Sequence, residues 1–192
     1  CEAAGIGPHV VQLAGCEAHW MAEGARVAEA AGADIIDINM GCPSKSVAAS
    51  GSGAALIKTP DLAHAIVRAA RQGLEDWAGG QSIHSQGFKP SRIEFIHTLN
   101  HSRSGVPVVP RRLLPLSIKT RLGFDCVVVE RWVEHLLEAR PAAITLHGRT
   151  LQQMYRGAAD WSAIAEAAKL AHGTGTLMLG NGDLNTLVDA IR

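Results

Sequence analysis

The order of apolar and polar residues along the chain predicts a strand followed by a helix, repeated five times. Residues 10–13 form a short apolar run, and residues 17–31 repeat apolar side chains at helical spacing before Gly32, which is placed as a helix C-cap. The further predicted strands are 34–40, 116–120, 142–147 and 177–180, and the further predicted helices are 60–71, 130–140, 161–173 and 184–191. Thr59 and Asp160 are placed as N-caps of two of these helices.

This alternation predicts an α/β protein with a parallel sheet, and isoleucines on both faces of strand 34–40 predict that this strand is covered on both sides. A TIM (β/α)8 barrel and a doubly wound sheet are both open at this point. Polar residues lie at or just past the C-terminal end of each predicted strand, where barrels assemble their active sites, and no G-x-G-x-x-G turn follows the first strand. The sequence therefore favours an incomplete TIM barrel with about five β/α units.

Residues 72–114 break this pattern. Gly, Ser, His, Gln and Pro crowd the segment, and an irregular loop of this length is uncommon inside a compact domain. We expect an insertion into the barrel. Its basic residues outnumber its acidic ones, which leaves two interpretations open, contact with RNA and a solvated loop.

Composition removes several classes of protein. The 18 basic and 18 acidic residues cancel, so no overall charge indicates nucleic-acid binding. The four cysteines are widely spaced, which argues against a zinc site and a disulfide framework. No apolar run is long enough for a membrane helix and no signal peptide is evident, so a cytoplasmic protein is expected.

Single polar residues at the predicted strand ends each allow two interpretations. Cys42 is either an inert buried thiol or, since a thiol is mostly protonated at neutral pH, a general acid. Lys119 lies on an apolar strand and needs either a structural salt bridge or a bound anion or electron-rich cofactor. His147 is either a hydrogen-bonded core residue or a ligand, and the adjacent Arg149 favours a ligand. The segment 181–183 is either a helix-capping turn, with Asp183 as the cap, or part of a site.

Taken together, the strand ends carry an amide, a thiol, an ammonium group and an imidazole. They include no carboxylate pair and no metal triad, which points away from glycosidases and metallohydrolases. This combination fits a bound planar cofactor.

Four stretches of the chain resemble the tRNA-dihydrouridine synthases, which are flavin enzymes built on a TIM barrel. They are DINMGCPSKSVAASGSGAALIKTPDL, LPLSIKTRLGFD, ITLHGRTLQQMYRGAADWSAI and LGNGDL, and with VVQLAG they cover nearly all of the chain outside the insertion. The motif GCPSKSV is most similar to the DusC branch of the family.

The resemblance implies a reductase that uses FMN, with NADPH as reductant, to reduce the C5–C6 double bond of uridine in tRNA. Cys42 matches the proton donor to C5, and Asn39 and Arg149 match positions at the substrate. The residues implied to bind FMN are Gln12, Lys119, His147, Asn181, Gly182 and Asp183. No metal is implied, and the full-length protein is expected to be a monomer.

The resemblance also implies parts that this sequence does not show: a first barrel strand, two last strands and a helical tRNA-binding domain. Two alternatives stay open. One is a flavin barrel that acts on a free pyrimidine, as dihydroorotate dehydrogenase does, and the other is a non-catalytic RNA-binding derivative of the fold.

Overall fold

The computed structural model describes residues 7–80, 89–91, 93–94 and 112–191. Five parallel strands form one sheet in the order β1-β2-β3-β4-β5. The strands are β1 (Val10–Leu13), β2 (Ile35–Met40), β3 (Leu116–Arg121), β4 (Ala143–His147) and β5 (Leu177–Asn181). Each strand therefore lies beside the one that precedes it in the sequence.

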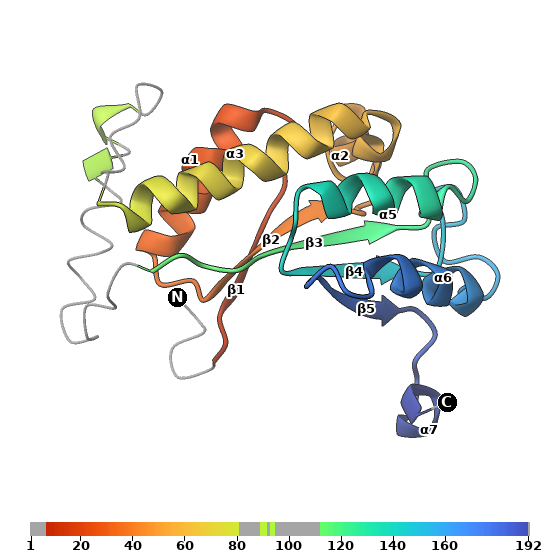
Figure 1. The fold of residues 1–192 in the computed structure, drawn as a ribbon. Helices are drawn as coiled ribbons and strands as arrows, with labels where there is room; N and C mark the ends of the chain where they lie inside the picture. The colour runs from red at the N-terminus through yellow and green to blue at the C-terminus, as the bar shows by residue number, and fades with distance from the viewer. Residues whose placement is uncertain (1–6, 81–88, 92, 95–111, 192) are drawn as a thin grey trace.

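Four longer helices connect these strands and cover one face of the sheet (Figure 1). They are α1 (Ala18–Ala30), α3 (Pro60–Ala78), α5 (Val129–Glu138) and α6 (Trp161–Ala171), and the shorter elements are α2 (Lys45–Ala49), the 3-10 helix η1 (Gly53–Lys58) and α7 (Leu187–Ile191). A doubly wound sheet carries helices on both faces. Sequential strands with helices on one face are instead the arrangement of a TIM barrel, so the predicted incomplete barrel is confirmed.

The two faces of the sheet differ sharply in chemistry. On the helix-covered face, Ile36, Ile38, Ile118 and Ile144 are each 0% exposed and form the core with the apolar sides of the helices. The other face carries polar residues at matching register positions. We expected β2 to be covered on both sides, and this was wrong for the described part of the chain, where helices cover one side only (Figure 1).

Helix α3 is longer than the sequence indicated. It ends at Ala78 rather than near residue 71, so the irregular segment does not begin at residue 72 as predicted. The added turns pack on α1, where Arg26 pairs with Asp76. The rest of the predicted insertion lies largely outside the described residues.

Two helix starts test the predicted caps. Asp160 caps α6, since its Oδ1 accepts a hydrogen bond of 2.9 Å from the backbone N–H of Ala163. Thr59 precedes α3 but makes no side-chain capping bond, although Pro60 occupies the first turn as expected. Among the described residues, no helix is both long and apolar enough to cross a membrane.

Candidate functional site

The uncovered face of the sheet places the predicted site residues in adjacent positions. Across the strands, Gln12 lies opposite Asp37, and Asn39 lies opposite Lys119. Arg121, His147 and Asn181 continue the next row. Because parallel strands end at the same edge, these side chains meet at the C-terminal rim, where TIM barrels bind their ligands.

Cys42 lies on a turn whose backbone is hydrogen-bonded to the Asn39 side chain. The Asn39 Oδ1 accepts hydrogen bonds from the backbone N–H groups of Gly41 at 3.1 Å and Cys42 at 2.9 Å, and its Nδ2 donates to Gln12 Oε1 at 2.8 Å. Cys42 is half-buried and forms no disulfide with any described residue. Asn39 thus anchors the cysteine turn, a role that the sequence did not indicate.

Arg121 is a site residue that sequence reasoning missed. Its Nε donates to the Gly41 carbonyl at 2.7 Å, and its Nη1 donates to the carbonyls of Thr150 and Met154 at 3.2 and 3.3 Å. The guanidinium therefore ties the cysteine turn to the loop that follows β4. The signal was present in the sequence, because Arg121 lies two residues after Lys119 and so shares its face of the strand.

Burial lowers the pKa of Arg121, and Arg149 lowers it further, whereas the nearby Tyr155 and Cys42 raise it. This coupling places the Cys42 sulfur within electrostatic range of a buried cation.

Lys119 is half-buried on the uncovered face. Burial is the main cause that lowers its pKa, Arg121 lowers it further, and Asp37 partly opposes the shift. Among the residues that the structure describes, none forms an ion pair with Lys119. Of the two sequence-based interpretations, a structural salt bridge is thus not formed in this part of the chain.

His147 is neutral at pH 7. Burial lowers its pKa to about 4, and the cations Arg121, Lys119 and Arg149 add to the effect, with only Asp183 opposing it. Its Nε2 lies 3.4 Å from the Arg149 Nη1. A neutral imidazole can both donate and accept a hydrogen bond, so His147 can serve as a polar contact without adding charge.

Arg149 and Asp183 form an ion pair across the loops that follow β4 and β5. The Arg149 Nη2 lies 2.7 Å from Asp183 Oδ1 and also donates to the Gly157 carbonyl at 2.6 Å. Asp183 Oδ2 accepts from the Ala159 N–H at 2.7 Å, and this bond, together with Arg149, lowers the pKa of Asp183. Of the two interpretations of residues 181–183, a helix-capping turn is not formed, since the Asp183 carboxylate joins two loops and α7 begins only at Leu187.

The backbone of Gly182 lies close to the His147 ring. Its φ of +128° suits glycine, and an added Cβ would lie 2.8 Å from the Ala159 Cβ and 3.1 Å from the His147 Cδ2. The preceding Asn181 ends β5, and its backbone carbonyl accepts from the Gly148 N–H at 2.9 Å. The segment 181–183 is thus a tight loop at the rim.

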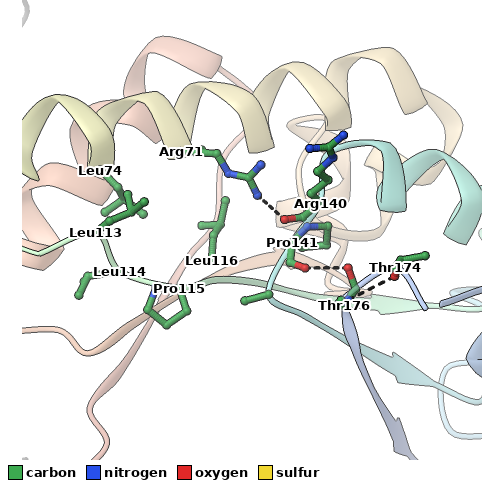
Figure 2. Close-up of a pocket in the computed structure, with 12 residues that line it drawn as sticks. Arg71, Leu74, Leu113, Leu114, Pro115, Leu116, Arg140, Pro141, Thr174 and Thr176 are labelled. Carbon is green, nitrogen blue, oxygen red and sulfur yellow. Dashed lines mark hydrogen bonds between the residues drawn. The ribbon is translucent and has the colours of Figure 1, made fainter. Parts of the chain in front are cut away.

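A separate cavity of about 260 Å³ lies at the opposite, N-terminal end of the strands (Figure 2). Figure 2 shows Arg71 donating to the Arg140 carbonyl above the apolar residues Leu114 and Pro115, and this bond is 2.5 Å long. The Thr176 hydroxyl is already bonded to the Pro141 carbonyl. The cavity contains none of the predicted site residues.

The fold and the rim define a TIM-barrel protein whose candidate site lies at the C-terminal ends of its strands. The sequence profile of the dihydrouridine synthase (Dus) family matches residues 2–76 and 101–192. The chain therefore belongs to the dihydrouridine synthase family. The profile leaves out residues 77–100, which fall within the segment predicted as an insertion.

Individual relatives agree with this assignment. A probable tRNA-dihydrouridine synthase of Rhizobium leguminosarum bv. phaseoli is 36% identical over 98% of this chain and 47% of its own length. The tRNA-dihydrouridine synthase B of Vibrio vulnificus is 29% identical over 92% of this chain and 42% of its own length. The chain thus spans about half the length, or slightly less, of these curated relatives.

A solved structure, that of DHODH from Eimeria tenella in complex with ferulenol, superposes with a TM-score of 0.50 at 16% identity. It covers 88% of this chain and 44% of the other. This likeness supports the barrel fold alone. Within the described ranges, no group of three or more His, Cys, Asp or Glu residues is placed to hold a metal ion.

Proposed function

We propose that the protein is a tRNA-dihydrouridine synthase that uses FMN and NADPH to reduce the C5–C6 double bond of uridine in tRNA. The observation that carries the proposal is one rim that combines the Cys42 turn, the neutral His147 and Lys119, which forms no ion pair with any residue that the structure describes. The family assignment supports the reaction type and tRNA as the substrate. A cytoplasmic location and a monomeric full-length protein belong to the same proposal.

The rim residues fit a flavin. The isoalloxazine ring is planar and gains negative charge at its pyrimidine edge on reduction, and Lys119 offers a cation without an ion-pair partner in the described chain. His147 supplies a neutral polar contact, and the tight loop of Asn181, Gly182 and Asp183 lies against it at the rim. Gln12 faces the same side of the sheet. When bound, FMN would supply the hydride that adds to uracil C6, and NADPH would restore it.

Cys42 is the proposed proton donor. Its S–H bond breaks as a new C–H bond forms at C5, and the electrons of the former C5–C6 double bond form that bond. The sulfur is left as a thiolate until solvent returns a proton, and the buried Arg121 guanidinium holds the turn that carries it through the Gly41 carbonyl. Asn39 and Arg121 together hold the turn that carries the thiol.

Asn39 and Arg149 are proposed to contact the substrate. The structure limits which of their atoms are available for this contact. Both side chains already make protein contacts, Asn39 to the Cys42 turn and Arg149 to Asp183. Their substrate contacts would therefore use the remaining N–H groups. A target uridine inside folded tRNA must leave its stack to reach such a rim.

A flavin enzyme of free pyrimidines is the second candidate. It rests on the superposition with DHODH, whose 16% identity shows the fold alone. A non-catalytic RNA-binding protein would have no need to keep Cys42, Lys119 and His147 on one rim. The family assignment and this rim together favour the tRNA enzyme.

The test uses the full-length protein. We expect it to purify with a bound flavin and, with NADPH, to form dihydrouridine in tRNA taken from a strain that lacks the modification. Activity on free uracil or orotate without activity on tRNA would favour the second candidate. Protein that stays colourless after reconstitution with FMN would overturn both.

A further inference from the structure

A chain of hydrogen bonds runs along the uncovered face of the sheet and ends at the cysteine turn. Asp37 is only 9% exposed. Its Oδ2 accepts from the Gln12 Nε2 at 2.6 Å, and its Oδ1 accepts from the Ser117 hydroxyl at 2.6 Å. Gln12 Oε1 then accepts from Asn39 Nδ2 at 2.8 Å. Asn39 Oδ1 finally accepts from the N–H groups of Gly41 and Cys42.

Both ends of this chain have fixed polarity, whereas its middle does not. A carboxylate can only accept hydrogen bonds, and a backbone N–H can only donate them. The amides of Gln12 and Asn39 can each be turned over, which exchanges donor and acceptor. With Asp37 as a carboxylate, Gln12 must present its NH2 group to Asp37 and its oxygen to Asn39. Asn39 must then direct its own oxygen to the cysteine turn.

We propose that Asp37 is a positioning residue that fixes, through Gln12 and Asn39, the polarity of the amide that holds the Cys42 turn. Its carboxylate sets the order of donors and acceptors along these hydrogen bonds and does not contact the reacting atoms. Without it, Gln12 can turn over and offer its NH2 group to Asn39. Asn39 then either loses that bond or turns its own NH2 group toward two backbone donors, which releases the turn.

The inference rests on the proposed role of Cys42, because it concerns the turn that carries the thiol. The side chain of Asp37 lies on the same face as Lys119 and acts to raise the pKa of that lysine. Ser117 is the direct neighbour of Asp37 on β3. Among the described residues, Asp37 is the one acidic residue that takes part in this chain of hydrogen bonds.

The decisive change is Asp37→Asn, because it keeps size and shape but removes the fixed polarity: an amide at this position can present either its oxygen or its NH2 group to Gln12. Amide hydrogen exchange by NMR on the 192-residue chain reads the turn directly. We expect the Gly41 and Cys42 amides to exchange about fivefold to tenfold faster, as a weakened hydrogen bond implies. The Ala54 amide, which bonds to the Cys42 carbonyl at 3.2 Å, reports whether the loss stays local.

The matched control is Asp34→Asn, the same substitution at an acidic residue just before the same strand. Asp34 bonds to the His9 N–H and to Arg112, away from the cysteine turn. It should leave both amides unchanged. If Asp37→Asn fails to fold, Gln12→Met breaks the chain at its middle and should accelerate the same two amides. Unchanged exchange at Gly41 and Cys42 in the variant that folds would overturn the inference.

Turnover by the full-length enzyme adds a second readout. We expect Asp37→Asn to lower kcat about tenfold or more while the KM for tRNA changes little, since the residue acts on the donor turn and not on tRNA binding. An equal rise in KM with unchanged kcat would contradict a positioning role. A wild-type enzyme without synthase activity would reject the proposed function, whereas the exchange data would still decide the role of Asp37.

Discussion

Each charged side chain at the strand ends has a state that its immediate neighbours decide. Lys119 and His147 lie among the cations Arg121 and Arg149, and both have a lowered pKa because burial removes water from them. Arg149, by contrast, forms an ion pair with Asp183. The rim thus holds one unpaired ammonium group, within the described chain, beside one uncharged imidazole.

The half-buried ammonium group of Lys119 should lower the free energy of unfolding of the chain. Lys119→Met removes an ammonium group that is half-buried without an ion pair in the described chain, so we expect unfolding in urea to require about 1 kcal/mol more free energy. Lys58→Met is the matched control, because Lys58 pairs with Asp125 at 2.9 Å and lies over the Phe124 ring. It should not stabilise the chain. A Lys119 variant that is less stable than wild type would show that the ammonium group has a structural partner.

His147 should make stability depend on pH. Its folded pKa of about 4 lies below the ordinary value of 6.5, so the unfolded chain binds the proton more tightly. The contribution is therefore complete above pH 6.5 and is lost as the pH falls toward 4. Relative to His147→Gln, the wild-type chain should lose on the order of 2 kcal/mol over this range. Urea unfolding at pH 7.5 and 4.5 measures the difference, and parallel losses in both proteins would contradict the assigned pKa.

The sequence predicted which residues lie at the rim but not which of them touch. Position at or just past the C-terminal end of a strand was enough for Cys42, Lys119 and His147, because parallel strands end at one edge. The pairing of Arg149 with Asp183 joins residues far apart in the sequence, and no local pattern encodes it. Substrate and flavin contacts of the predicted residues remain predictions.

At the scale of elements, packing between helices determined where α3 ends, which the local sequence pattern did not indicate. All five strands were predicted within a residue or two, because their apolar runs are short and bounded. The end of α3 was missed because residues 72–78 contain Gln, Gly and Asp, which are typical of loops. Contact with α1 stabilises these turns as a helix, and the turns α2 and η1 after Cys42 gave no periodic signal.

The crossing of α1 and α3 should be intolerant of one added methyl group. A Cβ on Gly73 would lie within 3.0 Å of the Ala22 backbone carbonyl. We expect Gly73→Ala to destabilise the chain by about 2 kcal/mol, although alanine is intrinsically the better helix former by about 1 kcal/mol. Unfolding in urea measures both terms together.

Gly24→Ala in α1 provides the matched control for that change. Its added Cβ would meet the Leu13 side chain at 3.5 Å, which is ordinary van der Waals contact. Helix propensity should therefore dominate, and the variant should be up to about 1 kcal/mol more stable. Equal effects of the two substitutions would show that the helices can separate at the crossing without cost.

At the scale of the whole molecule, the division between a helix-covered face and a polar face is what makes the chain a candidate enzyme. The helices on one face bury the apolar side of β2, β3 and β4 and partly cover that of β1 and β5 (Figure 1), and the residues of the rim lie on the other face. This segregation explains why a chain with no net charge can still hold a cluster of cations at one edge. The proposed chemistry follows from that cluster and from the thiol beside it.

Separating the two half-reactions in the full-length Cys42→Ala enzyme tests the central claim most directly. Reduction of bound flavin by NADPH should proceed at close to the wild-type rate, whereas dihydrouridine formation in tRNA should fall by at least about 100-fold because the proton donor is gone. Cys126→Ala, which removes an exposed thiol, should leave both steps unchanged. A Cys42→Ala enzyme that still forms dihydrouridine at the wild-type rate would contradict the account.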